Sequence, residues 1–171
     1  MEINQVLASY LAKILGETTA FKFVAHGFHW NVKGAGFPYY HSFFETIYSD
    51  ADDAIDTIAE NIRKLNFDAP FLLTDLVALT EPITVTDTSD PLQMCASLYQ
   101  NNEQVRKCLL MGILLAEQAE QQGILNFLAE RFDQHSKWQW QLRTIIGDSI
   151  ADAYEIDVQE ITDSFLVEPT L

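Results

Sequence analysis

Apolar residues recur every three or four positions through four long segments of this chain, the spacing that places them along one face of an α-helix. Only seven glycines and five prolines occur among the 171 residues, and Gly34, Gly36, Gly123 and Gly147 fall where the apolar stripes stop. The pattern therefore predicts an all-α protein. The expected helices cover residues 4–32, 38–65, 91–122 and 124–146.

The start of the third expected helix is the best marked in the chain. Asp90 is a good N-cap, because its carboxylate can accept a hydrogen bond from a free N–H group of the first turn, and Pro91 fits the first helical position. Before this helix lies a long connection, residues 66–85. Connections of that length in compact domains usually carry structure of their own, so we expect a short helix at residues 74–79.

Two helical hairpins joined by a long crossover are the arrangement of a ferritin-like four-helix bundle. We expect this bundle to occupy residues 1–147 as one domain, because a chain of this length suits a single well-buried core. Residues 148–171 contain seven acidic and no basic side chains. We expect them to form an acidic C-terminal extension.

The charge of the chain argues against nucleic acid as a partner. Its formal net charge of −15 comes from 25 acids against 10 basic residues, and such a surface repels phosphate. The first ten residues and the last 28 contain no Lys or Arg, so neither end can act as a basic DNA-binding tail. We therefore expect no direct DNA binding.

The apolar segments and the cysteines indicate in which cellular compartment the protein works. The longest clearly apolar run, Leu109–Ala116, is too short to span a membrane, and the N-terminal residues lack the continuous apolar stretch of a signal peptide. Cys95 and Cys108 form no CxxC pair, and we expect both to be reduced residues of the core. These features predict a cytoplasmic protein without a membrane partner.

The second expected helix carries a row of metal-binding residue types. Six acids and no Lys or Arg occur between residues 41 and 61. One interpretation is a solvated polar face, and the other is a metal site, because carboxylates four residues apart repel one another unless a cation lies between them. The spacing alone leaves both open. The residues that fall on one side of this helix are His41, Glu45, Asp52, Asp56 and Glu60.

Distances along the chain decide whether one chain could supply all the ligands of such a metal site. His29 and His41 flank the first turn, so an antiparallel hairpin brings them together, and Glu45 lies one helical turn further on. Asp56 lies ~22 Å from His41 along the helix, which no side chain can span. A site that includes Asp56 and Glu60 therefore needs two chains, and a two-fold pairing would create two such sites.

Ordinary di-iron bundles hold their metal inside one bundle, with a Glu-x-x-His pair on each of two helices. This sequence contains no Glu-x-x-His. We therefore expect the site at a subunit interface rather than in the bundle core.

Residues 26–34, which read His-Gly-Phe-His-Trp-Asn-Val-Lys-Gly, resemble the Dps (DNA protection during starvation) family of mini-ferritins. The resemblance continues through Phe37, His41 and Tyr48 and is strong over residues 20–65. It implies a hollow dodecamer with an iron core and with ferroxidase sites at its two-fold interfaces. By position, the ligands would be His29, His41 and Glu45 from one subunit and Asp56 and Glu60 from its neighbour.

The resemblance also bears on residues around the implied site. Trp30 resembles the family's tryptophan beside the iron site, which is thought to intercept oxidising radicals, and an interface aromatic is an equally open interpretation. The family usually has Asp where Glu45 stands. The acids that line the family's three-fold iron pores have no direct counterpart in residues 121–126, which read Gln-Gln-Gly-Ile-Leu-Asn.

Imidazole and carboxylate ligands suit Fe(II), and carboxylates stabilise the Fe(III) product. We expect a ferroxidase that oxidises Fe(II), preferably with hydrogen peroxide, and stores ferric iron in a protein cage, protecting against oxidative damage. Zn(II) should compete at the same ligands, because affinity alone does not select iron. The alternatives are a non-enzymatic, DNA-compacting Dps protein and a Dps-shaped scaffold recruited for another task.

Two further histidines need an assignment. His26 lies one turn before His29, and we expect it to make a local hydrogen bond rather than to support the metal site. His135 lies on the apolar stripe of the fourth expected helix, and we expect a core histidine with its hydrogen bonds satisfied.

Overall fold

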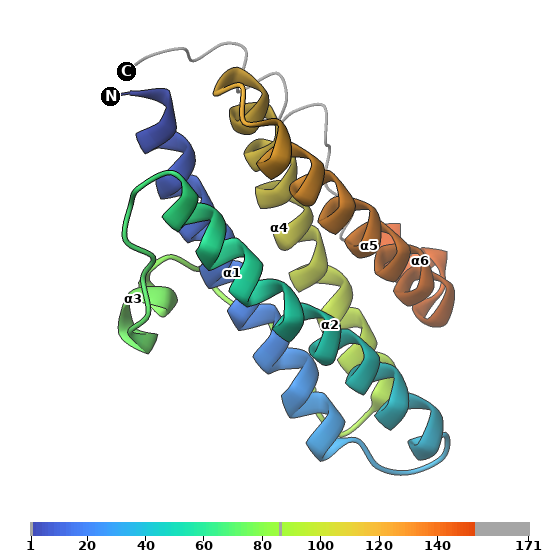
Figure 1. The fold of residues 1–171 in the computed structure, drawn as a ribbon. Helices are drawn as coiled ribbons and strands as arrows, with labels where there is room; N and C mark the ends of the chain where they lie inside the picture. The colour runs from blue at the N-terminus through green and yellow to red at the C-terminus, as the bar shows by residue number, and fades with distance from the viewer. Residues whose placement is uncertain (1, 86, 153–171) are drawn as a thin grey trace.

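Four long helices and two short ones make up the part of the chain that the computed structural model describes, residues 2–85 and 87–152, and no strand occurs in these ranges (Figure 1). Two helical hairpins lie side by side, with a short helix in the crossover between them (Figure 1). The expected all-α, ferritin-like four-helix bundle is confirmed. The helices are α1 (Ile3–Asn31), α2 (Phe37–Lys64), α3 (Leu73–Ala78), α4 (Pro91–Gln118), α5 (Gln122–Ile146) and α6 (Asp148–Ala151).

The core lies where α1 packs against α2 and α4, and where α4 packs against α5. Burying each large apolar side chain there stabilises the fold by roughly 1.5–3 kcal/mol. Cys95 and Cys108 belong to this core as buried, unpaired cysteines, and burial raises the pKa of each thiol to about 12. The expectation for both cysteines is confirmed. The largest fully buried side chains are Trp138, Phe21, Phe44, Leu7, Leu11, Ile14, Ile47, Ile58, Ile62, Met94, Leu98 and Leu109.

The ends of the helices follow local hydrogen bonding. At the start of α4 the Asp90 carboxylate accepts a hydrogen bond of 3.0 Å from the Leu92 N–H, as predicted, with Pro91 in the first turn. The end of α4 was predicted wrongly, since the helix stops at Gln118 rather than at residue 122. A Schellman motif ends it, with Glu120 in the left-handed region at φ 56° where a glycine is usual. Because no glycine stands at residue 120, the sequence did not mark this end of the helix.

The short helix α3 is held against α1 by a close approach at Gly16. A Cβ atom at Gly16 would lie 2.9 Å from the Leu76 carbonyl oxygen, so a side chain there would push α3 away. Just after α3, Glu81 is fixed to α1 twice. Its carboxylate accepts a hydrogen bond of 2.8 Å from the Lys13 ammonium, and its N–H donates one of 2.9 Å to the Glu17 carboxylate.

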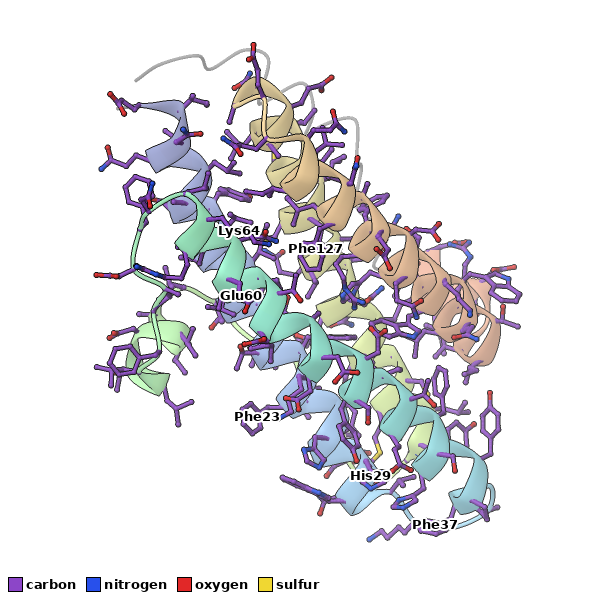
Figure 2. The ribbon with its side chains drawn as sticks, in the orientation of Figure 1. Phe23, His29, Phe37, Glu60, Lys64 and Phe127 are labelled. Atoms are coloured by element: carbon purple, nitrogen blue, oxygen red, sulfur yellow. The ribbon has the colours of Figure 1, made fainter. Side chains whose placement is uncertain are left out.

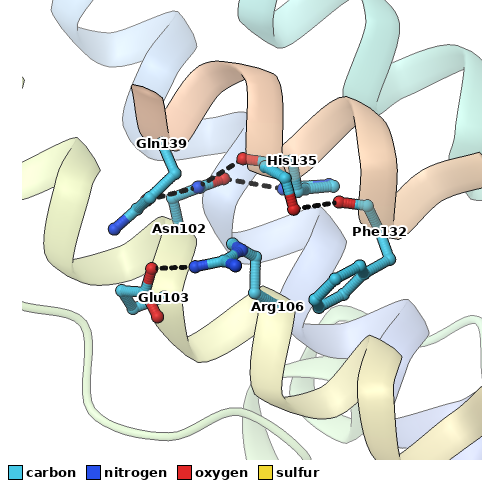
Figure 3. A network of polar contacts seen from close by, with 7 residues as sticks. Asn102, Glu103, Arg106, Phe132, His135 and Gln139 are labelled. Carbon is cyan, nitrogen blue, oxygen red and sulfur yellow. Dashed lines mark hydrogen bonds and ion pairs between the residues drawn. The ribbon is translucent and has the colours of Figure 1, made fainter. Parts of the chain in front are cut away.

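A polar cluster lies inside the bundle between α4 and α5 (Figure 3). His135 Nδ1 donates to Asn102 Oδ1 at 2.7 Å, and Asn102 Nδ2 donates to the His135 carbonyl oxygen at 2.9 Å and to Gln139 Oε1 at 2.6 Å. Glu103 and Arg106 form an ion pair beside it (Figure 3). Burial holds the pKa of His135 well below its usual 6.5, so the ring is neutral. The prediction of a satisfied core histidine is confirmed.

After α5 the structure describes only the short helix α6 and the residue that follows it, up to residue 152. Arg143 contacts Asp148 at 2.9 Å and Asp152 at 2.6 Å, which ties α6 and the residue after it to α5. The rest of the predicted acidic extension, residues 153–171, lies outside the described residues. Among the helices that are described, none is long and apolar enough to cross a lipid bilayer.

Candidate metal centre

Two histidines lie face to face where α1 ends and α2 begins. The rings of His29 and His41 are stacked, with centroids 3.7 Å apart and planes inclined by 21°. Between them the chain turns through Gly34 and Gly36, whose φ angles of 88° and 82° lie in the region that disfavours side chains. The predicted approach of the two histidines is confirmed, and Figure 2 shows His29 at this end of the bundle, near Phe37.

Each histidine is locked by the backbone of the other. His29 Nδ1 lies 2.9 Å from the carbonyl oxygen of His41, and His41 Nδ1 lies 2.9 Å from the carbonyl oxygen of His29. A carbonyl oxygen only accepts, so both Nδ1 atoms must carry the proton. In the neutral rings both Nε2 atoms then keep a lone pair, the form in which imidazole binds a metal.

Aromatic side chains hold the histidine pair from both sides. The Phe37 ring stacks on His41 with centroids 4.9 Å apart, and the Tyr48 ring meets His29 edge-on at 5.2 Å. These contacts restrict ring rotation and exclude water from part of the pair. Neither aromatic residue was predicted to have a role at the site. Their spacing on α2, four residues before and seven after His41, was the available signal.

His26 does not behave as predicted. Its ring stacks on Tyr48 with centroids 4.0 Å apart and also contacts Trp30 at 4.2 Å. Its Nδ1 is buried, and within the described ranges it has no hydrogen-bond partner, so the expected local hydrogen bond at this atom was wrong. Burial lowers the pKa of this ring. His26 instead links the exposed Trp30 to the aromatic residues around His29.

The carboxylates expected at the site lie at different distances along α2. Glu45 is exposed one helical turn after His41, whereas Asp56 and Glu60 are exposed in the second half of the helix. Because α2 is continuous from Phe37 to Lys64, Asp56 is ~22 Å from His41 in this fold too. Figure 2 shows Glu60 far from His29 toward the other end of α2.

Two acids of α2 form ion pairs with basic side chains, although no Lys or Arg occurs between residues 41 and 61. Asp52 contacts the Lys22 ammonium of α1 at 3.1 Å, and Asp50 contacts the Arg131 guanidinium of α5 at 2.5 Å. The partners come from neighbouring helices, so α2's own sequence could not show them. None of the ion pairs of the described residues includes Glu45, Asp56 or Glu60.

The bundle interior, as far as the described residues form it, offers no alternative metal site. Its buried acids, among the described residues, are Glu17 and Glu103. The first accepts the Glu81 N–H and the second pairs with Arg106, so both are occupied. No three His, Cys, Asp or Glu side chains of residues 2–85 and 87–152 come together as a possible metal site. One chain brings together the two imidazoles and leaves Asp56 and Glu60 apart from them.

Comparisons with known proteins place this chain in a family. A family model for the ferritin-like domain matches residues 8–149. General stress protein 20U of Bacillus subtilis is 23% identical over 145 residues, which cover 85% of this chain and 100% of that protein. A DNA protection during starvation protein of Helicobacter pylori is 39% identical over 64 residues, which cover 37% of this chain and 44% of that protein.

Solved structures of Dps proteins have the same fold. A Dps protein from Vibrio cholerae, described as a member of a broad superfamily of ferritin-like diiron-carboxylate proteins, matches with a TM-score of 0.80 at 24% identity, covering 85% of this chain and 91% of that one. A Dps protein from Bacillus brevis matches with a TM-score of 0.79 at 23% identity, covering 86% and 100%. The resemblance to Dps proteins is thus confirmed, and the chain belongs to the ferritin-like domain family.

Proposed function

We propose that this protein oxidises Fe(II), preferably with hydrogen peroxide, at sites shared between two copies of the chain. The ferric product is stored inside a hollow assembly of twelve copies. Iron is thus both substrate and cargo. The observation that carries the proposal is the pair of stacked histidines, His29 and His41, whose reciprocal hydrogen bonds leave both Nε2 atoms able to bind a metal.

A second copy supplies what one chain cannot. His29, His41 and Glu45 form one half of the site, and Asp56 and Glu60 form the other half on the same rigid helix. An antiparallel pairing about a two-fold axis sets each histidine half against the acidic half of the partner. Two sites per pair then form from one kind of contact.

The surface of α3 and its surroundings supports such a pairing. Phe71, Leu73 and Val77 are 82%, 68% and 69% exposed, and Phe23 and Trp30 of α1 are also exposed. In Figure 2 Phe23 points away from the bundle, on the side where α3 lies. We assign the covering of these exposed apolar side chains to a second copy of the chain.

The ligands fit the reaction. Two Fe(II) ions bound side by side each give one electron to hydrogen peroxide, the O–O bond breaks, and two protons complete two water molecules. Because both electrons arrive together, no hydroxyl radical is released. The carboxylates of Glu45, Asp56 and Glu60 balance the added charge of the Fe(III) product. Trp30, whose ring contacts that of His26 beside His29, could donate an electron to any oxidant that escapes.

The test is the initial rate of Fe(II) oxidation by hydrogen peroxide in the iron-free protein, compared with the rate with dissolved oxygen. Asp56→Asn should lower the peroxide rate at least about tenfold, because it weakens a metal ligand while keeping its size. Asp133→Asn removes the same charge from the exposed face of α5 and should leave the rate unchanged. If both variants assemble correctly and oxidise Fe(II) at equal rates, Asp56 is not a ligand of the site.

A further inference from the structure

The spacing of the proposed ligands along α2 fixes how two copies of this helix would align. His41 and Glu45 are four residues apart, and so are Asp56 and Glu60. One antiparallel register therefore sets His41 opposite Glu60 of the second copy and also sets Glu45 opposite its Asp56. The two-fold axis of this register crosses α2 midway between Glu45 and Asp56. The inference below rests on the proposed function, which supplies these ligand pairs.

Ser49 and Asp52 are the side chains of the ligand-bearing face that lie closest to this axis. Both are exposed, and they flank the crossing point at residues 50–51. Asp50 faces another way, because residues two apart point to different sides of a helix and Asp50 contacts Arg131 of α5 at 2.5 Å. A two-fold axis keeps equivalent residues on the same side of the pair, so the two Asp52 residues would lie only ~4.5 Å apart along the helix direction.

Asp52 has a basic partner within its own chain. The Lys22 ammonium of α1 lies 3.1 Å from the Asp52 carboxylate, and the side chains of Lys22 and Asp52 are 17% and 59% exposed. The same ammonium lies 4.5 Å from the centre of the Phe23 ring, which further restricts it. Lys22 is the only Lys or Arg in residues 14–32, and residues 41–61 contain none. The single basic side chain of these two segments thus lies where the acids of two copies would meet.

Like charges that face each other across an interface oppose binding, so two uncompensated Asp52 carboxylates would push the copies apart. The exposed neighbour Asp53 adds to this negative charge. With Lys22 bound to each Asp52, opposite charges alternate around the axis, and such an arrangement is complementary to itself. We propose that the Lys22–Asp52 ion pairs of two copies meet at the two-fold axis and form a four-charge cluster that stabilises the pairing in this register.

The register is tested by disulfide trapping in the full-length, iron-free protein. Ser49→Cys places one thiol per copy beside the axis, with Cα atoms ~6 Å apart if the two α2 helices pack at about 8–10 Å, a separation that a disulfide can bridge. Ser42→Cys is the matched control, because Ser42 is also exposed and lies seven residues earlier on the same side of α2. Its two copies would be ~25 Å apart along the helix direction.

We expect diamide to produce a disulfide-linked dimer of Ser49→Cys, seen on a non-reducing denaturing gel, and no such dimer of Ser42→Cys. Cys95 and Cys108 are buried, so the unmodified protein should not become linked. A linked dimer of Ser42→Cys, or none of Ser49→Cys, would overturn the register.

The charge cluster is tested by the chain concentration at which half of the protein is assembled, measured by sedimentation velocity. Lys22→Met should raise this concentration at least about tenfold, because the two Asp52 carboxylates then lack a counter-charge. Adding Asp52→Asn to this variant should restore assembly, since it removes the repulsion. Lys137→Met removes the same charge from an exposed position of α5 and should have no effect. Equal values for Lys22→Met and Lys137→Met, or no rescue by Asp52→Asn, would overturn the cluster.

Peroxide-driven Fe(II) oxidation by the reduced Ser49→Cys protein separates this inference from the proposed function. If the variant forms the linked dimer but oxidises no iron, and the unmodified protein is equally inactive, the pairing is supported and the ferroxidase activity is refuted. If it oxidises iron at the unmodified rate but forms no linked dimer, the register alone is refuted.

Discussion

Replacing Gly16 with valine should detach α3 from the bundle while the four long helices stay folded. A Cβ atom at this position would lie 2.9 Å from the Leu76 carbonyl oxygen and 3.1 Å from Leu79 Cβ. Both neighbours are parts of α3 or its end rather than flexible side-chain tips. Overpacking of this kind typically costs about 1–3 kcal/mol. No residue of α3 itself is fully buried, so the cheapest response is for α3 to move.

The displacement should reach the proposed pairing surface, because Phe71, Leu73 and Val77 lie in or next to α3. We expect Gly16→Val to lower the assembly mass in sedimentation velocity and to reduce peroxide-driven Fe(II) oxidation per chain. Hydrogen exchange should accelerate in residues 71–81 and stay slow in α4. Gly123→Ala is the control, since a Cβ there meets no atom within 4 Å. A Gly16→Val protein with full assembly and unchanged exchange in α3 would refute this role of the glycine.

Two more predictions concern zinc and pH. Zn(II) added before Fe(II) should slow peroxide-driven oxidation in proportion to the zinc bound, because it takes the same Nε2 atoms of His29 and His41; an unchanged rate with zinc bound would place the zinc elsewhere. Burial keeps His135 neutral in the native state, whereas the unfolded chain protonates it below pH 6.5. Stability should therefore fall as the pH drops below 6.5, by up to about 1.4 kcal/mol per unit for this group. His135→Gln should reduce that slope in urea unfolding between pH 6.5 and 5 at fixed chain concentration, and an identical slope would contradict the assignment.

The fold could be predicted because its determinants are local. Apolar stripes mark the long helices, and Asp90 with Pro91 marks the start of α4. The end of α4 was missed because Glu120 adopts the left-handed conformation that usually signals glycine. Asn66 ends α2 in the same conformation, at φ 66°, and is a residue that tolerates it.

The site was only partly predictable, because its details depend on contacts between helices. The approach of His29 and His41 followed from the short turn, but their reciprocal hydrogen bonds to backbone carbonyls left no mark in the sequence. The basic partners of Asp50 and Asp52 lie on other helices, so fewer acids of α2 are unpaired than the sequence of α2 suggests. The stacking of His26 on Tyr48 likewise joins α1 to α2.

The shared site can be tested by co-expressing two defective variants in equal amounts. One carries His29→Ala and His41→Ala, and the other carries Asp56→Ala and Glu60→Ala. Each alone should be inactive in peroxide-driven Fe(II) oxidation. In a mixed pair, one site combines both defects and the other combines the intact histidines with the intact acids. Random pairing makes about half of the pairs mixed, so about a quarter of the unmodified activity should return. Activity that stays at the level of the separate variants, in mixed assemblies verified by native mass spectrometry, would contradict a site built from two chains.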